Sequence, residues 1–469
     1  MSVIERLRPR AVRPRGGRSG RRPGPTSHAG IRRRPGQILV GSFAAAIGVG
    51  TLLLLLPASS AGRGATVIEA LFTATSAVCV TGLIVVDTAT FWTPFGQAVI
   101  MMLFQVGGFG IMTLASLLGL LISRRLGLHS RLMSASATRS VSLGDLRKVL
   151  LGIGIVTVLV EGITAVILTG RFLVTYGEPL GRAAWLGAFH AVSAFNNAGF
   201  ALYTDNLMGF VTDPWVCLPI AAAVIVGGIG FPVLLELWRS PRRPRSWSLH
   251  TKISVMMTAV LVVVGAVFMT LAEWSNPATL GPLDVRGKVL AGFFQGVMPR
   301  TAGFNSVDTA QMNSGTWLGT DVLMFIGGGS GGTAGGIKIT TFTVLLVIIW
   351  AELRGDPDAT LFDRRVAAPV QRQALAVALL GIAAVLVPTI VIAMTAPFTS
   401  DEVLYEVISA FATVGLSTGI TADLEGWHQV LLCLLMFVGR LGPVTLGTAL
   451  ALRSKQRLVR KPESAPIVG

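Results

Sequence analysis

The chain of 469 residues has very little charge, since only 13% of its residues are Asp, Glu, Lys or Arg. A typical soluble globular protein has about 25%. Acidic residues are the scarcer kind, with 23 Asp and Glu against 39 Lys and Arg, whereas 52% of the chain is hydrophobic. This composition excludes a disordered protein and an ordinary cytosolic enzyme, and it favours a chain that lies in a lipid bilayer.

Cysteine is also scarce. The three cysteines, Cys79, Cys217 and Cys433, are far apart and lie in apolar sequence, with no CxxC pair. This spacing excludes a disulfide scaffold and favours small buried thiols over a metal or redox centre. The five histidines are equally scattered, so the sequence predicts neither a zinc site nor a cofactor.

Long apolar runs are what the sequence does have. Residues 36–57 are uncharged, and at about 1.5 Å rise per residue they can cross a hydrocarbon core of about 30 Å. Seven further stretches have a similar character, so we expect eight spans. The predicted spans are 36–57, 92–123, 149–170, 214–238, 253–273, 316–351, 373–396 and 427–452.

The basic residues lie between these spans. Thirty-one of the 39 fall in the segments 1–35, 124–148, 239–252, 352–372 and 453–461. If the spans alternate, all five segments lie on one side, which the positive-inside rule makes cytoplasmic. The sequence thus predicts a multi-pass protein of the cell membrane with both termini in the cytoplasm. The first segment holds eleven arginines and is predicted to be a disordered basic arm. Because orientation explains its charge, we expect no nucleic acid partner.

Each pair of spans encloses another apolar piece that is too short to cross the membrane. Each piece has an aromatic residue, followed ten residues later by a glycine and then by Leu or Phe. Because these glycines keep the same register, we predict a fourfold repeat of span, re-entrant helix and span. The short pieces are 66–77, 184–195, 288–298 and 402–411, and the glycines are Gly82, Gly199, Gly303 and Gly415.

The predicted fold class is an all-α polytopic membrane protein with four tandem helix–pore-loop–helix repeats around a central pore. The second span of each repeat also carries a related motif, which begins at Val106, Val226, Ile326 and Val438. The predicted divisions are the basic arm 1–35, repeat 1 at 36–123, repeat 2 at 124–238, repeat 3 at 239–351, repeat 4 at 352–453 and a cytoplasmic tail at 454–469.

The loops that end at the four glycines carry no acidic side chain. Extended chain at membrane depth exposes carbonyl groups, which is tolerated where they line a water-filled path. Four such loops around one axis would form a ring of oxygens that replaces the hydration shell of a monovalent cation. The alternative is that the glycines only let helices pack closely. The predicted ion-binding residues are Val78, Cys79, Val80, Thr81, Gly82, Asn196, Asn197, Ala198, Gly199, Arg300, Thr301, Ala302, Gly303, Ala412, Thr413, Val414 and Gly415.

The loops VCVTGL, NNAGF, PRTAGF and ATVGLSTG, with GGGSGGTAGGIK and GRLGPVTL, resemble the Trk/Ktr/HKT superfamily of potassium transporters. The resemblance covers about residues 36–453 and is strongest to the KtrB-type ion-translocating subunit. It implies that the four glycines form a selectivity filter that binds K+ at backbone carbonyls. In plant relatives a serine at the first of these positions accompanies sodium preference, so Gly82 favours potassium. The resemblance also implies a homodimer, a cytoplasmic KtrA-like ring of nucleotide-binding regulatory subunits, and sodium assistance.

The sixth predicted span contains seven glycines within residues 327–336. At about 1 kcal/mol lost per glycine, this segment is not expected to be helical. The resemblance implies that it is an intramembrane gate below the filter, with a linker or a packing kink as the alternative. The predicted gating residues are Gly327, Gly328, Gly329, Ser330, Gly331, Gly332, Thr333, Ala334, Gly335, Gly336, Lys338 and Arg440.

Arg440 lies inside the eighth predicted span, where an arginine costs on the order of 2.5–3.5 kcal/mol. We expect it to face the pore and contact residues 327–336, with an ion pair to Glu161 as the alternative. Lys338 either stabilises the same segment or extends to the membrane interface. Arg300 is expected to orient the third loop rather than to contact the ion.

The sequence therefore predicts potassium uptake driven by the electrochemical gradient, since it has no ATP-binding motif. It predicts no enzyme activity, because no catalytic pair or metal-ligand set lies at matching depth. The alternative is a sodium-permeable or poorly selective monovalent cation transporter of the same superfamily. Potassium is the predicted transported ion, and sodium is a second candidate.

Overall fold

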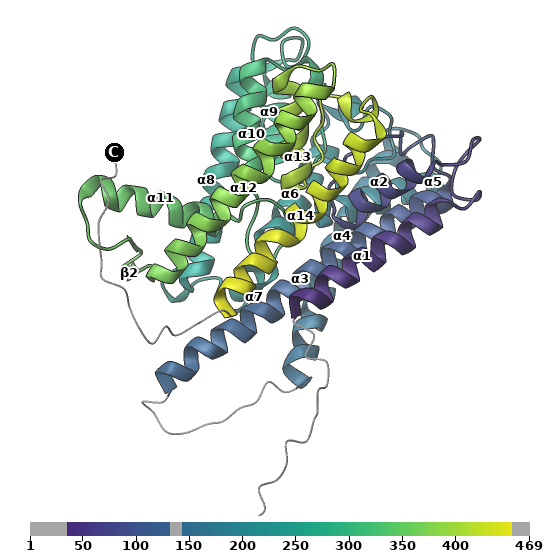
Figure 1. Ribbon diagram of the computed structural model, residues 1–469. Coiled ribbons are helices and arrows are strands. Elements are labelled where there is room, and N and C mark those ends of the chain that lie inside the picture. Colours follow the sequence, from purple (N-terminus) through teal and green to yellow (C-terminus); the bar gives the residue numbers. More distant parts are fainter. Residues whose placement is uncertain (1–34, 132–142, 453–469) are drawn as a thin grey trace, which may run out of the picture.

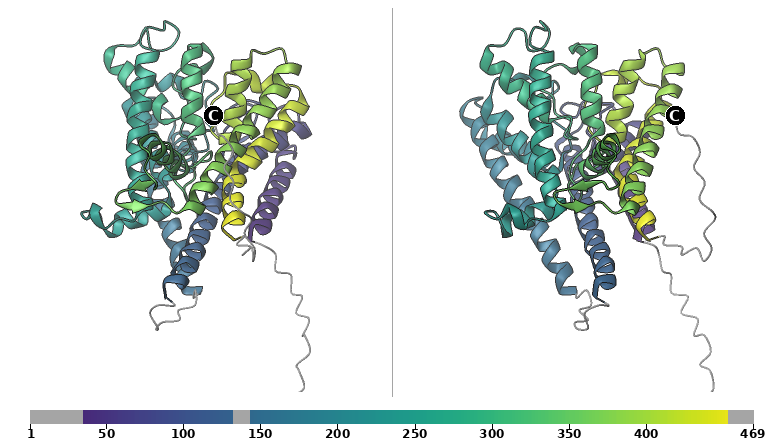
Figure 2. Two further views of the ribbon diagram at one scale, coloured as in Figure 1. Left: turned by 60° about the vertical axis from the view of Figure 1, so that its left-hand side comes forward. Right: turned by 90° about the vertical axis from the view of Figure 1, so that its left-hand side faces the viewer.

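The computed structural model of the protein describes residues 35–131 and 143–452 (Figure 1). The predicted basic arm, except Pro35, and the predicted tail lie outside these residues. In the described part a long helix, a short helix and a further helical segment follow one another four times. Figure 2 shows these helices side by side in a bundle, with the short helices set toward one end.

The first two groups are α1 (Pro35–Leu54), α2 (Val67–Val78) and α3 (Pro94–Arg131), then α4 (Leu143–Val174), α5 (Leu180–Asn196), α6 (Pro214–Ile229) and α7 (Phe231–Arg239). The last two groups are α8 (Leu249–Ala272), α9 (Val285–Val297), α10 (Ser314–Phe325) and α11 (Ile339–Arg354), then α12 (Ala368–Thr395), α13 (Ser400–Ala412) and α14 (Gly426–Leu452). The short helices α2, α5, α9 and α13 correspond to the four short apolar pieces of the sequence.

Four helices in the described part are long and apolar enough to cross a membrane, namely α3, α4, α8 and α12, and the bent pair α6–α7 would add a fifth. Helices α1 and α14 contribute shorter apolar stretches, Val40–Leu54 and Gly426–Gly442. Helices α10 and α11, with 12 and 16 residues, are each short for a span. The eight predicted spans are therefore not eight straight helices.

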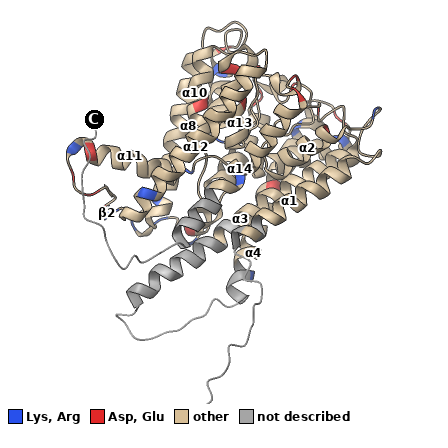
Figure 3. Cartoon of the chain, in the orientation of Figure 1, with Lys and Arg blue, Asp and Glu red and all other residues tan. Residues whose placement is uncertain are grey.

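Large apolar side chains cover the outer surfaces of α4, α8 and α12. Val166 of α4 is 73% exposed and Met394 of α12 is 80% exposed. An apolar surface of this extent is unusual on a soluble protein and fits contact with lipid. Figure 3 shows the corresponding scarcity of charged residues along the described helices.

The span predicted at 214–238 is a bent pair of helices and not one straight helix. The chain bends by 96° between α6 and α7. Gly230 at the bend has a φ of 105°, which favours glycine. Pro232 follows in the first turn of α7, where its missing N–H costs nothing. The N–H of Phe231 donates to the carbonyl of Gly331 instead of continuing the helix. The bend therefore places α7 against the glycine-rich segment.

The sixth predicted span, 316–351, is also not one helix. Helix α10 ends at Phe325 and α11 begins only at Ile339, so the glycine-rich segment is non-helical, as its composition predicted. Helix α11 then runs across the direction of α8 and α12 (Figures 1 and 2). It leads into a two-stranded antiparallel hairpin, β1 (Thr360–Leu361) and β2 (Arg364–Arg365). The hairpin is a small departure from the predicted all-α fold.

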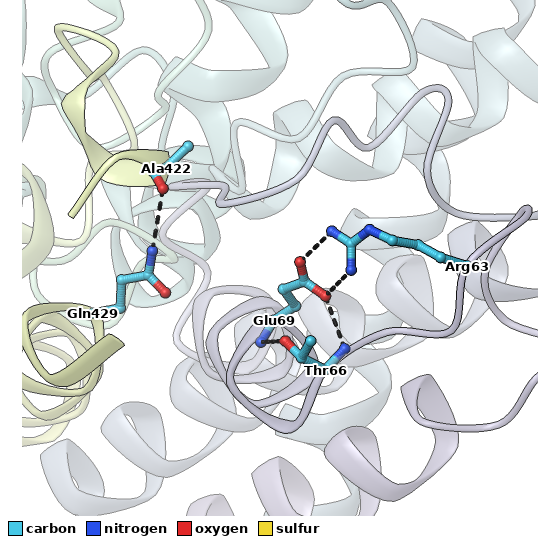
Figure 4. Close-up of polar contacts among 5 residues, drawn as sticks. All are labelled: Arg63, Thr66, Glu69, Ala422 and Gln429. Atoms are coloured by element: carbon cyan, nitrogen blue, oxygen red, sulfur yellow. Dashed lines mark hydrogen bonds and ion pairs between the residues drawn. The ribbon is translucent and has the colours of Figure 1, made fainter. Parts of the chain in front are cut away.

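Helix α2 begins at a capping box that Figure 4 shows. The Thr66 hydroxyl accepts from the N–H of Glu69 at 3.3 Å, and the Glu69 carboxylate accepts from the N–H of Thr66 at 2.8 Å. Arg63 adds two hydrogen bonds to the same carboxylate. These bonds hold the pKa of Glu69 below its usual value. In the same figure Gln429 of α14 donates to the carbonyl of Ala422. Side chains thus fix both the start of the first short helix and the start of the last long helix.

In α3, α6 and α14 the second residue of the repeated motif is a glycine. This glycine lets each helix approach the end of a short helix closely. A Cβ atom at this position would lie 2.1 Å or less from a main-chain carbonyl oxygen, so no side chain fits. Each approached carbonyl belongs to the residue four positions before a loop glycine. The pairs are Gly107 with Val78, Gly227 with Phe195, and Gly439 with Phe411.

We expect Gly227→Ala to destabilise the protein, because its Cβ would lie 1.9 Å from the Phe195 oxygen. The free energy of unfolding should fall by roughly 1–3 kcal/mol. The measurement is thermal unfolding of the purified protein in detergent.

Gly162→Ala is the matched control. Gly162 lies inside α4, and nothing within 4 Å would meet its Cβ. This change should raise the free energy of unfolding by about 0.5–1 kcal/mol. Equal effects of the two substitutions would contradict the packing account.

Candidate functional site

Gly82, Gly199, Gly303 and Gly415 lie next to one another in a closed ring, which we call the glycine ring. A Cβ built on each of them would lie 3.0–3.1 Å from the Cα of the next, and the series returns from the fourth glycine to the first. The ring joins loops from all four groups of helices. Their common register in the sequence therefore corresponds to a common place in space.

The glycine ring depends on backbone angles that favour glycine, with φ between 71° and 98°. Two residues before each ring glycine, a non-glycine residue also has a positive φ, between 51° and 69°. Such angles cost free energy and persist only where the surroundings hold them. Each short helix therefore ends shortly before its ring glycine, and the chain continues through the ring as a non-helical segment. The left-handed residues are Val80, Asn197, Thr301 and Thr413.

The carbonyl group of the residue before each ring glycine also lies at the glycine ring. Its oxygen lies 2.1–2.8 Å from the Cβ position of the ring glycine in the neighbouring loop. The loops are therefore in main-chain contact around the ring. Of the 17 predicted ion-binding residues, all are buried except Gly415, which is half-buried. The four carbonyl groups belong to Thr81, Ala198, Ala302 and Val414.

The third loop is held differently from the other three. In the others the N–H before the ring glycine donates to a serine carbonyl at 2.7–2.8 Å, whereas Ala302 donates to Met298 at 3.0 Å. Arg300 is buried, and its Nη1 donates to the carbonyl of Thr258 in α8 at 3.2 Å. This contact fits the expected orienting role of Arg300. The serines of the other loops are Ser76, Ser193 and Ser409.

The glycine-rich segment 327–336 lies against three of the four loops. The Thr333 hydroxyl donates to the Asn197 side-chain oxygen at 3.0 Å, and the N–H of Gly335 donates to the Thr301 hydroxyl at 3.2 Å. A Cβ on Gly335 would lie 1.9 Å from the Thr413 hydroxyl. The segment is thus in contact with the second, third and fourth loops.

Two basic side chains hold this segment by its carbonyl groups. Arg440, which is 3% exposed, donates from Nη1 to the carbonyl of Thr333. Lys338 donates to the carbonyls of Ala334 and Gly335. The side chain of Lys338 is thus turned toward the segment, as the first of its two predicted roles requires.

The alternative ion pair between Arg440 and Glu161 is also wrong. The Glu161 carboxylate accepts from Gln105 at 3.4 Å and from the side-chain amide of Asn196 at 3.1 Å. Sequence reasoning missed this half-buried carboxylate and its amide partners beside the second loop. The signal was a lone acid within an apolar span, but the sequence did not show which amides would face it.

Among the residues that the structure describes, no group of three or more His, Cys, Asp and Glu side chains is placed to hold a metal ion. At the glycine ring itself the polar groups that meet are main-chain carbonyls. The fold and this site define a polytopic helical membrane protein in which four loops, each following a short helix, meet in the glycine ring and a glycine-rich segment lies against three of them.

The family of TrkH, described as "Cation transport protein", matches residues 32–459, and the chain belongs to this family. This result confirms the resemblance found in the sequence. The family and its named members are ion transport proteins. The prediction that the chain is not an enzyme is therefore also confirmed.

Several curated relatives match nearly the whole chain. The Ktr system potassium uptake protein B of Bacillus subtilis is 41% identical over 94% of this chain and 98% of its own length. The protein of the same name from Vibrio alginolyticus is 39% identical over 92% of this chain and 94% of its length. The potassium/sodium uptake protein NtpJ of Enterococcus hirae is 35% identical over 91% and 95%.

A solved structure shares the fold. The potassium transporter TrkH from Vibrio parahaemolyticus superimposes with a TM-score of 0.67 over 91% of this chain and 86% of that chain. Its sequence is 17% identical, so this likeness concerns the fold alone.

Proposed function

We propose that the protein takes up potassium across the cell membrane and that the loops around the glycine ring are its selectivity filter. The observation that carries the proposal is the ring itself, in which four glycines and the carbonyl groups before them meet around one axis. Carbonyl dipoles so placed can replace the hydration shell of a cation. The relatives at 41% and 39% identity are named potassium uptake proteins.

Neutral carbonyls suit a monovalent ion. A divalent ion is usually held by carboxylates, and none of the residues from Val78 to Gly82 or in the other three loops is acidic. In this proposal the ion gives up water at the ring and is coordinated by main-chain oxygens. The electrochemical gradient drives it inward.

We assign residues 327–336 as the gate. The segment contacts three filter loops from one side, so an ion that leaves the ring on that side meets it. Arg440 holds Thr333 and adds a positive charge at the same place. The charge of Arg440 and the segment itself would together block the ion path until the segment moves. Its seven glycines make other backbone conformations accessible.

The remaining parts of the proposal rest on the family, except the orientation, which rests on the distribution of the basic residues along the sequence. We propose both termini in the cytoplasm, a homodimer, a cytoplasmic KtrA-like nucleotide-binding ring and sodium assistance. The second candidate function is transport of sodium as well as potassium. It is favoured by the 35% identity to a protein named for potassium and sodium uptake.

The filter proposal predicts ion flux in proteoliposomes under opposed potassium and sodium gradients. Wild type should move potassium in preference to sodium. In Gly82→Ser the preference should fall by roughly tenfold, equivalent to about 1.4 kcal/mol. The reason is that its Cβ would lie 2.4 Å from the Ala198 oxygen.

Gly62→Ser is the matched control, since Gly62 also has a positive φ but nothing lies within 4 Å of its Cβ position. The preference of this variant for potassium over sodium should equal that of wild type. Equal fluxes of the two ions through wild type would favour the second candidate function, and no flux of either ion, with or without a cytoplasmic partner, would contradict both.

The gate proposal predicts faster potassium flux through Arg440→Ala. The substitution removes a buried charge from the path and the hydrogen bond to Thr333, and flux should rise by roughly tenfold or more. Arg182→Ala, which removes an exposed partner of Glu178, is the control. Flux through Arg440→Ala equal to wild type at every voltage and concentration would refute this role.

A further inference from the structure

Three of the short helices carry a polar side chain that accepts from the main chain beyond the glycine ring. In each case the donor is the N–H of the third residue after the ring glycine, and the acceptor side chain is buried. This repeated contact fastens the outgoing segment of a loop to its own short helix. The pairs are His190 with Leu202 at 3.3 Å, Gln295 with Ser306 at 3.3 Å, and Glu406 with Thr418 at 2.9 Å.

Glu406 makes by far the most extensive of these contacts. Its side chain is 1% exposed, and besides the Thr418 N–H it accepts from three hydroxyl groups. These are Ser417 at 2.5 Å, Thr418 at 3.3 Å and Thr421 at 2.8 Å. All four partners donate, which matches a carboxylate because it only accepts. One side chain therefore fixes the whole segment 417–421.

The residues just before and at Gly415 are bound to α13 as well. The N–H of Gly415 donates to the Ser409 hydroxyl at 3.0 Å, and the N–H of Val414 donates to the Ser409 carbonyl at 2.8 Å. Ser409 and Glu406 are both on α13, nearly one turn apart. The fourth loop is thus bound to one rigid helix both before and after its ring glycine.

We propose that Glu406 is a positioning residue for ion selectivity, which keeps the fourth side of the glycine ring at the spacing that suits K+. The inference deepens the proposed function and rests on it. Discrimination between K+ and Na+ by carbonyl groups depends on the size and stiffness of their cage. A carboxylate with four donors, buried directly behind one loop, is a source of that stiffness.

The test is Glu406→Gln in proteoliposomes, with initial rates of potassium and sodium uptake measured over a range of concentrations. Glutamine has nearly the same shape, but one acceptor oxygen becomes an NH2 group that faces donors. We expect the K+/Na+ preference to fall by about tenfold, with a higher KM for potassium and a smaller change in maximal rate. An unchanged preference in this variant overturns the proposal.

Glu273→Gln is the matched control. Glu273 is equally buried at 1% exposure and also accepts several hydrogen bonds, from Thr279, Asn313 and Thr316. These join the end of α8 to the start of α10 and do not involve a filter loop. The K+/Na+ preference of Glu273→Gln should therefore equal that of wild type. An equal loss of preference in both variants would show a general effect of burying an amide and would overturn the specific role.

A second variant keeps the test decisive if Glu406→Gln does not fold. The double substitution Ser417→Ala and Thr421→Val removes two donors and leaves the carboxylate in place. Its preference should fall in the same direction by a smaller factor, and an unchanged preference in the folded protein overturns the proposal. Failure of the proposed function looks different, because wild type itself would then show no preference for potassium.

Discussion

Main-chain contact between four distant segments is the constraint on which the rest of the structure depends. Each ring glycine leaves room for nothing larger than hydrogen beside the next loop. The contact requires positive φ angles at two positions per loop, and such angles persist only if the loops are held from outside. The short helices, their buried polar side chains and the close-packed glycines of α3, α6 and α14 provide that support.

The charged residues of the core serve the same requirement. Arg300 and Arg440 donate to main-chain carbonyl groups, Glu161 accepts from amides, and Glu406 accepts from hydroxyls and an N–H. Burying an isolated charge is costly, and the two carboxylates are each matched by several polar atoms of the chain. Each of the two arginines has one carbonyl partner, and Nε of both and Nη2 of Arg440 are buried without a hydrogen-bond partner. The matched groups lie around the loops and the glycine-rich segment, where irregular backbone has polar atoms to offer. A regular helix has few such atoms to spare.

The positions of the four short helices and of the ring glycines could be predicted from the sequence, because a fixed spacing between an aromatic residue and a glycine repeats four times. The non-helical segment 327–336 could be predicted as well, since its glycine content is enough to break a helix. The bend at Gly230 could not. The bend is held by a contact of Phe231 with Gly331, about a hundred residues later, and the local sequence resembles that of the unbroken helices α3 and α14. The buried partners of Glu406 are closer in sequence, but without the loop conformation nothing singles that carboxylate out.

The central claim is that cations are coordinated by the carbonyl groups at the glycine ring. The most direct measurement is anomalous X-ray diffraction from crystals of the full-length protein in rubidium or thallium salts, which serve as heavy substitutes for potassium. The account predicts an anomalous peak on the axis of the ring, within coordination distance of the oxygens of Thr81, Ala198, Ala302 and Val414, that weakens when potassium competes. Ordered anomalous peaks elsewhere in the bundle, with none at the ring, in a protein that transports these ions would contradict it.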